Sequence, residues 1–225
     1  FAVSNDKGTY YFPYETAIVS DVFKKWVEDE SSKKSVFDAK KSIVALHKRG
    51  INLKGIDFDL FISSYVLNPA DSGEDLAAIV NKVLGTSVQS DEAFYGKGAK
   101  RAVPGVEALS QHLANKALAL YEIKDRMVKN LEENEQLKLV EELELPLSLI
   151  LAEMEIEGVK VDRETLQRMQ EEMAIKLTQI EKEIYELAGE TFNINSPKQL
   201  GVILFEKLNL PVIKKTKTGY STSAD

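Results

Sequence analysis

The stretch that decides the fold is Phe192-Asn193-Ile194-Asn195-Ser196-Pro197-Lys198-Gln199-Leu200, followed by Lys215-Thr216-Lys217-Thr218-Gly219-Tyr220-Ser221-Thr222-Ser223. Asn195 or Ser196 can cap a helix that begins at Pro197, because proline suits a first helical turn. The free N–H groups of such a turn suit a phosphate. Short polar side chains and lysines hold a nucleic-acid backbone without reading its bases. The pattern therefore predicts an anion-binding surface; the simpler alternative is a capped surface helix followed by a disordered lysine tail.

Charge is unevenly distributed along the 225 residues, which carry a formal net charge of −7. Residues 191–225 hold five lysines (198, 207, 214, 215 and 217) and two acids (Glu206 and Asp225), a balance of +3 that leaves −10 on the first 190 residues. The acidic body argues against nucleic acid binding over the whole surface, and the basic end indicates a local anion-binding surface. Zero cysteines exclude disulfides, thiolate metal sites and a cysteine nucleophile.

No apolar run approaches the ~18 residues of a membrane helix, so we expect no membrane partner. The opening Phe1-Ala2-Val3-Ser4 is typical of the middle of a strand, which predicts that the chain is a piece of a longer protein. The two histidines, His47 and His112, lie too far apart for a local metal motif or an arguable Ser-His-Asp set.

Strands and helices alternate through the first ~135 residues, which is typical of an α/β domain. The expected strands are 1–4, 9–12, 35–37 and 56–58, with a turn at Asn5–Gly8. The expected helices are 15–29, 39–49, 59–67, 74–84 and 106–134, and residues 86–103 read as a loop.

No convincing sheet is expected after Glu135. One helix is expected at Leu145–Glu157, and Asp162 is expected to cap a long helix that ends at Ala188. Apolar residues recur along this long helix in steps of three and four, which predicts a coiled-coil seam or, more simply, a core-facing helix. The seam residues are Leu166, Met169, Met173, Leu177, Ile180, Ile184 and Leu187. Nothing after Gly189 is long enough to cover the seam, so we expect its partner helix to lie in sequence outside this chain.

The opening stretches resemble the thumb of family A DNA polymerases, the bacterial polymerase I type. Gly96-Lys97-Gly98-Ala99-Lys100-Arg101-Ala102-Val103-Pro104 adds a close resemblance to the Bacillus group. The resemblance implies an α/β ribonuclease-H-like, exonuclease-type domain at 1–135 that lacks its first strand. An all-α thumb segment at 136–225, with its long coiled-coil-like helix, would follow and begin the polymerase domain.

Gly50-Ile51-x-Leu53-x-Gly55-Ile56-x-Phe58-Asp59 resembles the 3′–5′ proofreading domain of the same polymerases. Active members of that family hold two metal ions with four carboxylates. The family pattern places the first pair before Phe1, the third at Ser42 and the fourth at Lys116, with His112 in place of a tyrosine. Asp38 lies a full turn from Ser42 and is disfavoured as a substitute ligand. The resemblance therefore implies a relic domain without nuclease chemistry.

The parent would be a DNA-directed DNA polymerase (a nucleotidyltransferase) of DNA replication and repair, working as a monomer in the bacterial cytoplasm at the nucleoid. Its Mg²⁺ and deoxynucleotides would bind in palm and fingers, which this segment lacks. We assign the segment no catalytic residue and no metal ligand. Its partner would be primer-template duplex DNA, gripped by Asn193, Asn195, Ser196, Lys198, Lys215, Thr216, Lys217, Ser221 and Ser223.

Two alternatives come from other classes. The chain could be a stand-alone ribonuclease-D-like exonuclease, against which Ser42 and Lys116 argue. It could also be a non-enzymatic interaction module that uses the seam of helix 162–188 as a partner site.

Overall fold

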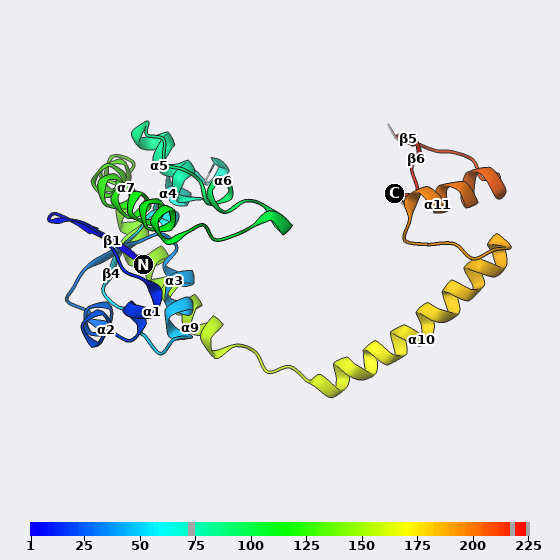
Figure 1. The fold of residues 1–225 in the computed structure, drawn as a ribbon, viewed down its shortest axis with the longest axis horizontal. Coiled ribbons are helices and arrows are strands. Elements are labelled where there is room, and N and C mark those ends of the chain that lie inside the picture. Colours follow the sequence, from blue (N-terminus) through cyan, green and yellow to red (C-terminus); the bar gives the residue numbers. More distant parts are fainter. Residues whose placement is uncertain (72–74, 217–218, 224–225) are drawn as a thin grey trace. The chain divides into compact units, whose positions relative to one another are not determined.

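A computed structural model describes residues 1–71, 75–216 and 219–223 of the chain (Figure 1). The chain divides into two compact units, Phe1–Gly158 and Val159–Asp225, called here the first and second unit. Among the described residues, no helix combines the length and the apolarity needed to cross a membrane.

The strands of the first unit form two small sheets. β1 (Ala2–Asn5) pairs antiparallel with β2 (Gly8–Tyr11), which confirms the predicted hairpin and its turn. β3 (Lys34–Val36) pairs parallel with β4 (Ile56–Asp59), and a helix connects them, as in the expected α/β arrangement.

Helices make up most of the first unit. They are α1 (Tyr14–Ile18), α2 (Asp21–Glu28), α3 (Ala39–His47), α4 (Leu60–Leu67), η1 (Pro69–Asp71), α5 (Leu76–Leu84), α6 (Asp91–Tyr95), η2 (Gly98–Lys100), α7 (Val106–Glu133), α8 (Leu137–Leu139), the π-helical turn η3 (Val140–Glu144) and α9 (Leu145–Glu157).

Two expectations for these helices are wrong. The single helix predicted over 15–29 is two helices, because Ser20 caps a new start with a hydrogen bond from the Phe23 N–H at 3.3 Å. The predicted loop 86–103 contains α6 and η2, and α6 begins at a similar cap, Ser90. In both places a serine followed by an acidic residue marks the helix start.

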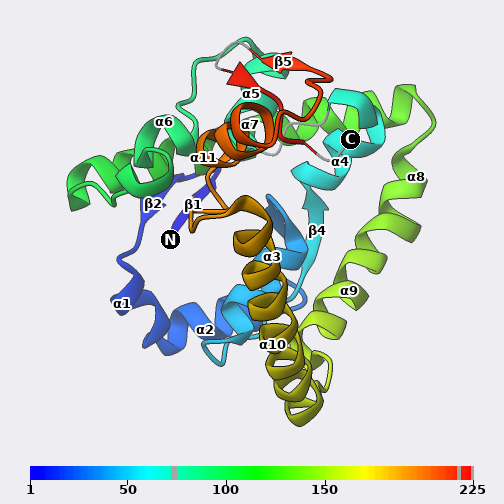
Figure 2. The same cartoon turned by 90° about the vertical axis from the view of Figure 1, so that its right-hand side faces the viewer.

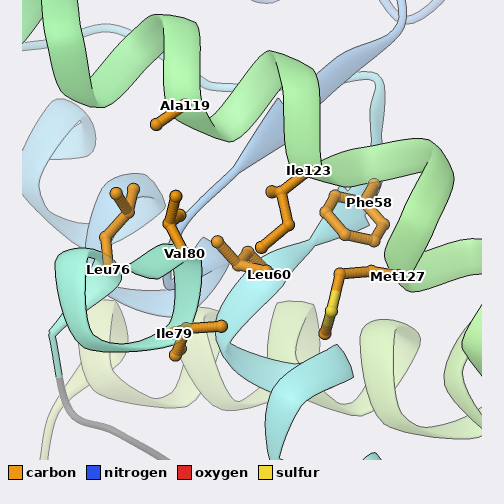
Figure 3. Packing of buried hydrophobic residues seen from close by; sticks show 8 residues of the cluster. All are labelled: Phe58, Leu60, Leu76, Ile79, Val80, Ala119, Ile123 and Met127. Atoms are coloured by element: carbon orange, nitrogen blue, oxygen red, sulfur yellow. The ribbon is translucent and has the colours of Figure 1, made fainter. Parts of the chain in front are cut away.

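The core of the first unit lies where α7 crosses α5 and β4. From Ala119 to Leu131 the buried residues of α7 repeat at intervals of four, so they form one stripe along the helix. Figure 3 shows this stripe against α5 and β4, and α5 lies beside α7 in Figures 1 and 2. The cluster consists of Phe58, Leu60, Leu76, Ile79, Val80, Ala119, Ile123 and Met127.

The segment that leads into β4 depends on Gly55 and Lys34. Gly55 has a positive φ of 70°, and a Cβ there would lie 2.5 Å from the Ser32 carbonyl oxygen, so glycine is required. Next to it, buried Lys34 donates from Nζ to the carbonyls of Asp29, Ser32 and Lys54 at 2.9, 2.6 and 3.0 Å. Burial lowers the pKa of Lys34.

The second unit begins with α10 (Arg163–Ala188), which Asp162 caps through the Thr165 N–H, as predicted. Next come α11 (Pro197–Gly201), the π-helical turn η4 (Val202–Lys207) and the hairpin of β5 (Lys215–Thr216) with β6 (Gly219–Tyr220). This hairpin corrects the expectation that no sheet follows Glu135.

The seam of α10 is open to solvent within this chain. None of the residues of α10 is buried, and five of the predicted seam residues are 44–62% exposed: Leu166, Met169, Met173, Leu177 and Ile180. The coiled-coil partner therefore stays a prediction.

Candidate nucleic-acid interface

The start of α11 is built by short polar side chains, and of the two predicted caps, Asn195 and Ser196, the structure has Ser196. The Asn193 side chain accepts the N–H of Asn195 at 3.0 Å, and Ser196 caps α11 by accepting the Gln199 N–H at 3.4 Å. Gln199, for which the sequence predicted no contact, accepts the Asn193 N–H at 2.8 Å. These bonds fold the turn back on the helix start, while Asn193, Asn195 and Lys198 remain exposed.

The described residues of the lysine tract pair as two short antiparallel strands, β5 and β6. Ser221 donates its N–H to the Lys214 carbonyl at 2.9 Å, next to the β5–β6 pairing. The Lys215 ammonium lies over the Tyr220 ring, 5.6 Å from its centroid, and the Ser223 N–H donates to Ser221 Oγ at 3.3 Å. Lys217 lies outside the described residues, and of Thr216 only the backbone is described.

The hairpin contacts α11, so the two predicted binding stretches belong to one surface of the second unit. Phe205 packs edge-on against Tyr220, with ring centroids 5.3 Å apart, and joins the two. Lys207 is paired with Glu190 at 2.6 Å. Lys198, Lys214 and Lys215 are exposed and have no ion pair within the described part of the chain, which leaves their charges available to an anion.

His112 and Lys116 of α7, two positions singled out by the sequence, meet on one carboxylate. Asp91 Oδ1 accepts from Lys116 Nζ at 2.7 Å and lies 2.9 Å from His112 Nε2. Partial burial would raise the pKa of Asp91, but the hydrogen bonds and charges of Lys116 and His112 outweigh it and hold this pKa below its ordinary value. The His112 ring is buried and stacks on Phe94, with centroids 3.9 Å apart.

Sequence reasoning missed Asp91. The carboxylate that contacts His112 comes from α6, not from a turn of α7. Ser90 followed by two acids was a usable helix-start signal for α6, but the partner of His112 is fixed only by the packing of α6 on α7.

Ser42, the third of the positions singled out by the sequence, donates its hydroxyl to the Asp38 carbonyl at 2.9 Å. The Asp38 side chain caps α3 through the Lys41 N–H. Asp59 accepts the N–H groups of Asp38, Ala39 and Phe61 at 3.0, 2.6 and 2.8 Å, so it joins the starts of α3 and α4. Burial raises the pKa of Asp59, and these hydrogen bonds oppose the rise. Both carboxylates therefore serve as helix caps.

Within residues 1–71, 75–216 and 219–223, no three His, Asp or Glu side chains are grouped so as to hold a metal ion. The Lys116 ammonium group forms an ion pair with the Asp91 carboxylate at 2.7 Å.

Two family profiles match the chain. The profile of the DNA polymerase I ribonuclease H-like domain matches residues 1–123, and that of DNA polymerase family A matches residues 163–225. The chain belongs to the DNA polymerase I family.

Similar whole proteins agree with this assignment. The chain is 56% identical over 225 residues to DNA polymerase I of Bacillus subtilis (strain 168) and 54% identical over 224 residues to that of Bacillus caldotenax. In each case all of this chain is covered, and it spans about a quarter (26%) of the relative's length.

A solved structure is also similar: the POL domain of Pol1 from M. smegmatis in complex with DNA primer-template and dNTP. The TM-score is 0.73 at 27% identity, over 99% of this chain and 36% of that one.

Proposed function

We propose that this chain is a segment of a DNA-directed DNA polymerase that extends primers with deoxynucleotides in replication and repair. In this proposal residues 1–135 are a scaffold without proofreading chemistry, and residues 136–225 begin the polymerase domain as the thumb that grips duplex DNA. The structural division falls later, after Gly158, because α9 packs on α3 within the first unit.

The observation that carries the proposal is the exposed basic surface of the second unit in a chain of this family. Lys198, Lys214 and Lys215 are exposed beside the polar turn at Asn193–Ser196, and this is the part of the sequence with a positive balance of charge. The proposed contacts are Asn193, Asn195, Ser196, Lys198, Lys215, Thr216, Lys217, Ser221 and Ser223. The similar mycobacterial domain was solved with primer-template, which supports a duplex ligand.

Catalysis is assigned to no residue of this segment. Deoxynucleotides and Mg²⁺ would bind in the palm and fingers of the parent, which would work as a monomer at the bacterial nucleoid. Binding by the segment would be indifferent to base sequence, because phosphate contacts carry no sequence information.

The test of the DNA grip is the salt dependence of duplex binding. Each lysine–phosphate contact contributes about 0.9 to the slope of log K against log salt. The double variant Lys198→Ala, Lys215→Ala should therefore lower the slope by about 1.8. The matched control is Lys176→Ala, Lys182→Ala on exposed positions of α10, which should keep the slope of the unmodified chain. Equal slopes for both double variants would refute the assignment.

The test of the missing nuclease chemistry is incubation of labelled single-stranded DNA with the chain and Mg²⁺ or Mn²⁺. We expect no release of mononucleotides, because Ser42 and Lys116 stand where the family pattern has carboxylates. Metal-dependent release that disappears in Asp38→Ala or Asp91→Ala would contradict this and favour the ribonuclease-D-like alternative.

A further inference from the structure

An open pocket of about 460 Å³ lies on the first unit, where α3 packs on α9 (Figure 1). Its walls carry Lys40, Lys41, Lys48 and Arg49 from α3 and its C-terminal end, and Glu155 from α9. Ala45 also lines the pocket, and Ser42 of the same helix does not.

The helical period explains why the cations meet there. Lys41, Ala45 and Lys48 are spaced by four and three residues, so they share one exposed face of α3. The small side chain of Ala45 leaves space between the two lysines. The hollow is thus bounded by positive groups along its length.

Of the four cations of the pocket, Lys40 is the one that an acid pairs with among the described residues. Asp38 also lines it, but its carboxylate is used as the cap of α3. Glu155 accepts from Lys40 at 2.6 Å, and this hydrogen bond and charge lower the pKa of Glu155. Lys41 and Lys48 have no ion pair within the described residues, and Arg49 lies over the Tyr14 ring at 5.6 Å, which leaves its charge uncompensated. Like charges on one face of a helix repel one another, and a bound anion relieves that repulsion.

We propose that this pocket binds phosphate groups, carried either by a single-stranded nucleotide chain or by free phosphate. Ammonium groups bind phosphate oxygens as point charges, and the guanidinium of Arg49 can donate two parallel hydrogen bonds. The site goes beyond the duplex grip proposed for the second unit, because it lies on the other unit and uses other lysines.

The absence of cysteine from the sequence allows a local test. Ala45→Cys places one thiol in the pocket, and Ala78→Cys, on the exposed face of α5, is the matched control. Alkylation by neutral iodoacetamide is followed with inorganic phosphate, with a ten-residue oligothymidylate, and with its uncharged methylphosphonate analogue. At a ligand concentration about ten times Kd, occupancy should slow alkylation of the pocket thiol about tenfold and leave the control thiol unchanged.

The three ligands of the alkylation experiment distinguish the possible sources of the phosphate. Protection by inorganic phosphate shows a site for free phosphate, and protection by the oligonucleotide alone shows a site for a nucleotide chain; the uncharged analogue should not protect. Adding Lys41→Ala and Lys48→Ala to the Ala45→Cys chain should abolish protection, whereas the exposed control pair Lys7→Ala, Lys138→Ala should preserve it. The proposal is overturned if neither charged ligand protects the thiol, or if protection survives loss of Lys41 and Lys48.

Discussion

The two units bury their apolar side chains to very different degrees. In the first unit, Ile123, Leu131 and Leu60 are fully buried at 0% exposure. In the described part of the second unit, Ile203 is the one buried hydrophobic residue, and the 26 residues of α10 bury none. Buried apolar area is the main favourable term in folding, so the first unit has its own core and the second lacks a comparable one within this chain.

The second unit is stabilised by local interactions instead. Asp162 and Ser196 cap its helices, Lys207 pairs with Glu190, and a short hairpin rests on α11. Each such contact contributes about 1 kcal/mol or less. The difference between the units predicts that the same type of substitution lowers the free energy of unfolding by more in the first unit than in the second.

The largest expected effect is in the core of the first unit. Ile123→Ala removes a fully buried side chain between α5 and β4 and should cost about 4 kcal/mol of unfolding free energy. Leu177→Ala on α10, 60% exposed, should cost less than about 0.5 kcal/mol. Urea unfolding is followed by the fluorescence of Trp26, the single tryptophan, for the first unit, and by hydrogen exchange at the amides of α10 for the second. An equal loss of unfolding free energy in Ile123→Ala and Leu177→Ala would mean that the seam of α10 is covered in solution.

A smaller effect is expected when one capping aspartate is removed from each unit. Asp59→Ala leaves the N–H groups at two helix starts without their acceptor, and should cost about 3 kcal/mol. Asp162→Ala removes one exposed cap of α10 and should cost about 1 kcal/mol of helix stability. Hydrogen exchange at the first-turn amides of α4 and α10 measures both. If Asp59→Ala lowers stability less than Asp162→Ala does, water has replaced the Asp59 carboxylate at the helix starts. The predicted difference between the two units would then be wrong.

The smallest effect is expected at an ion pair, and it depends on pH. Because the pKa of Asp91 is lowered from 3.8 in the folded chain, its stabilisation is present above pH 3.8 and is lost as pH falls through the folded pKa. Lys116→Met should cost about 0.5 kcal/mol near pH 7, since the Asp91 side chain is 45% exposed and partly screened. The counterpart Lys207→Met should leave the Trp26 transition unchanged.

Two measurements check this prediction. A carboxyl titration by NMR should show the pKa of Asp91 rising in Lys116→Met, and the unfolding free energies of the two chains should converge well below pH 3.8. An unchanged Asp91 pKa would show that His112 alone, or solvent, sets it.

Local order could be predicted from the sequence wherever one residue decides it. The cap at Asp162, the Ser196 cap of α11 and the helix ends at residues 84 and 188 are confirmed, because a side-chain acceptor or a following glycine acts within a few residues. The same signals at Ser20 and Ser90 were present but unused, and two helix assignments were wrong for that reason.

The sequence also determined the family, because the motifs around Gly50–Asp59 and Asn193–Leu200 are specific to it. Only the tertiary structure decided which groups meet. Asp91 reaches His112 and Lys116 from 21 and 25 residues away, and Glu155 reaches Lys40 across 115. Such pairs have no local spacing rule, since they depend on how α6 packs on α7 and α9 on α3. The distribution of buried area over the whole unit sets that packing.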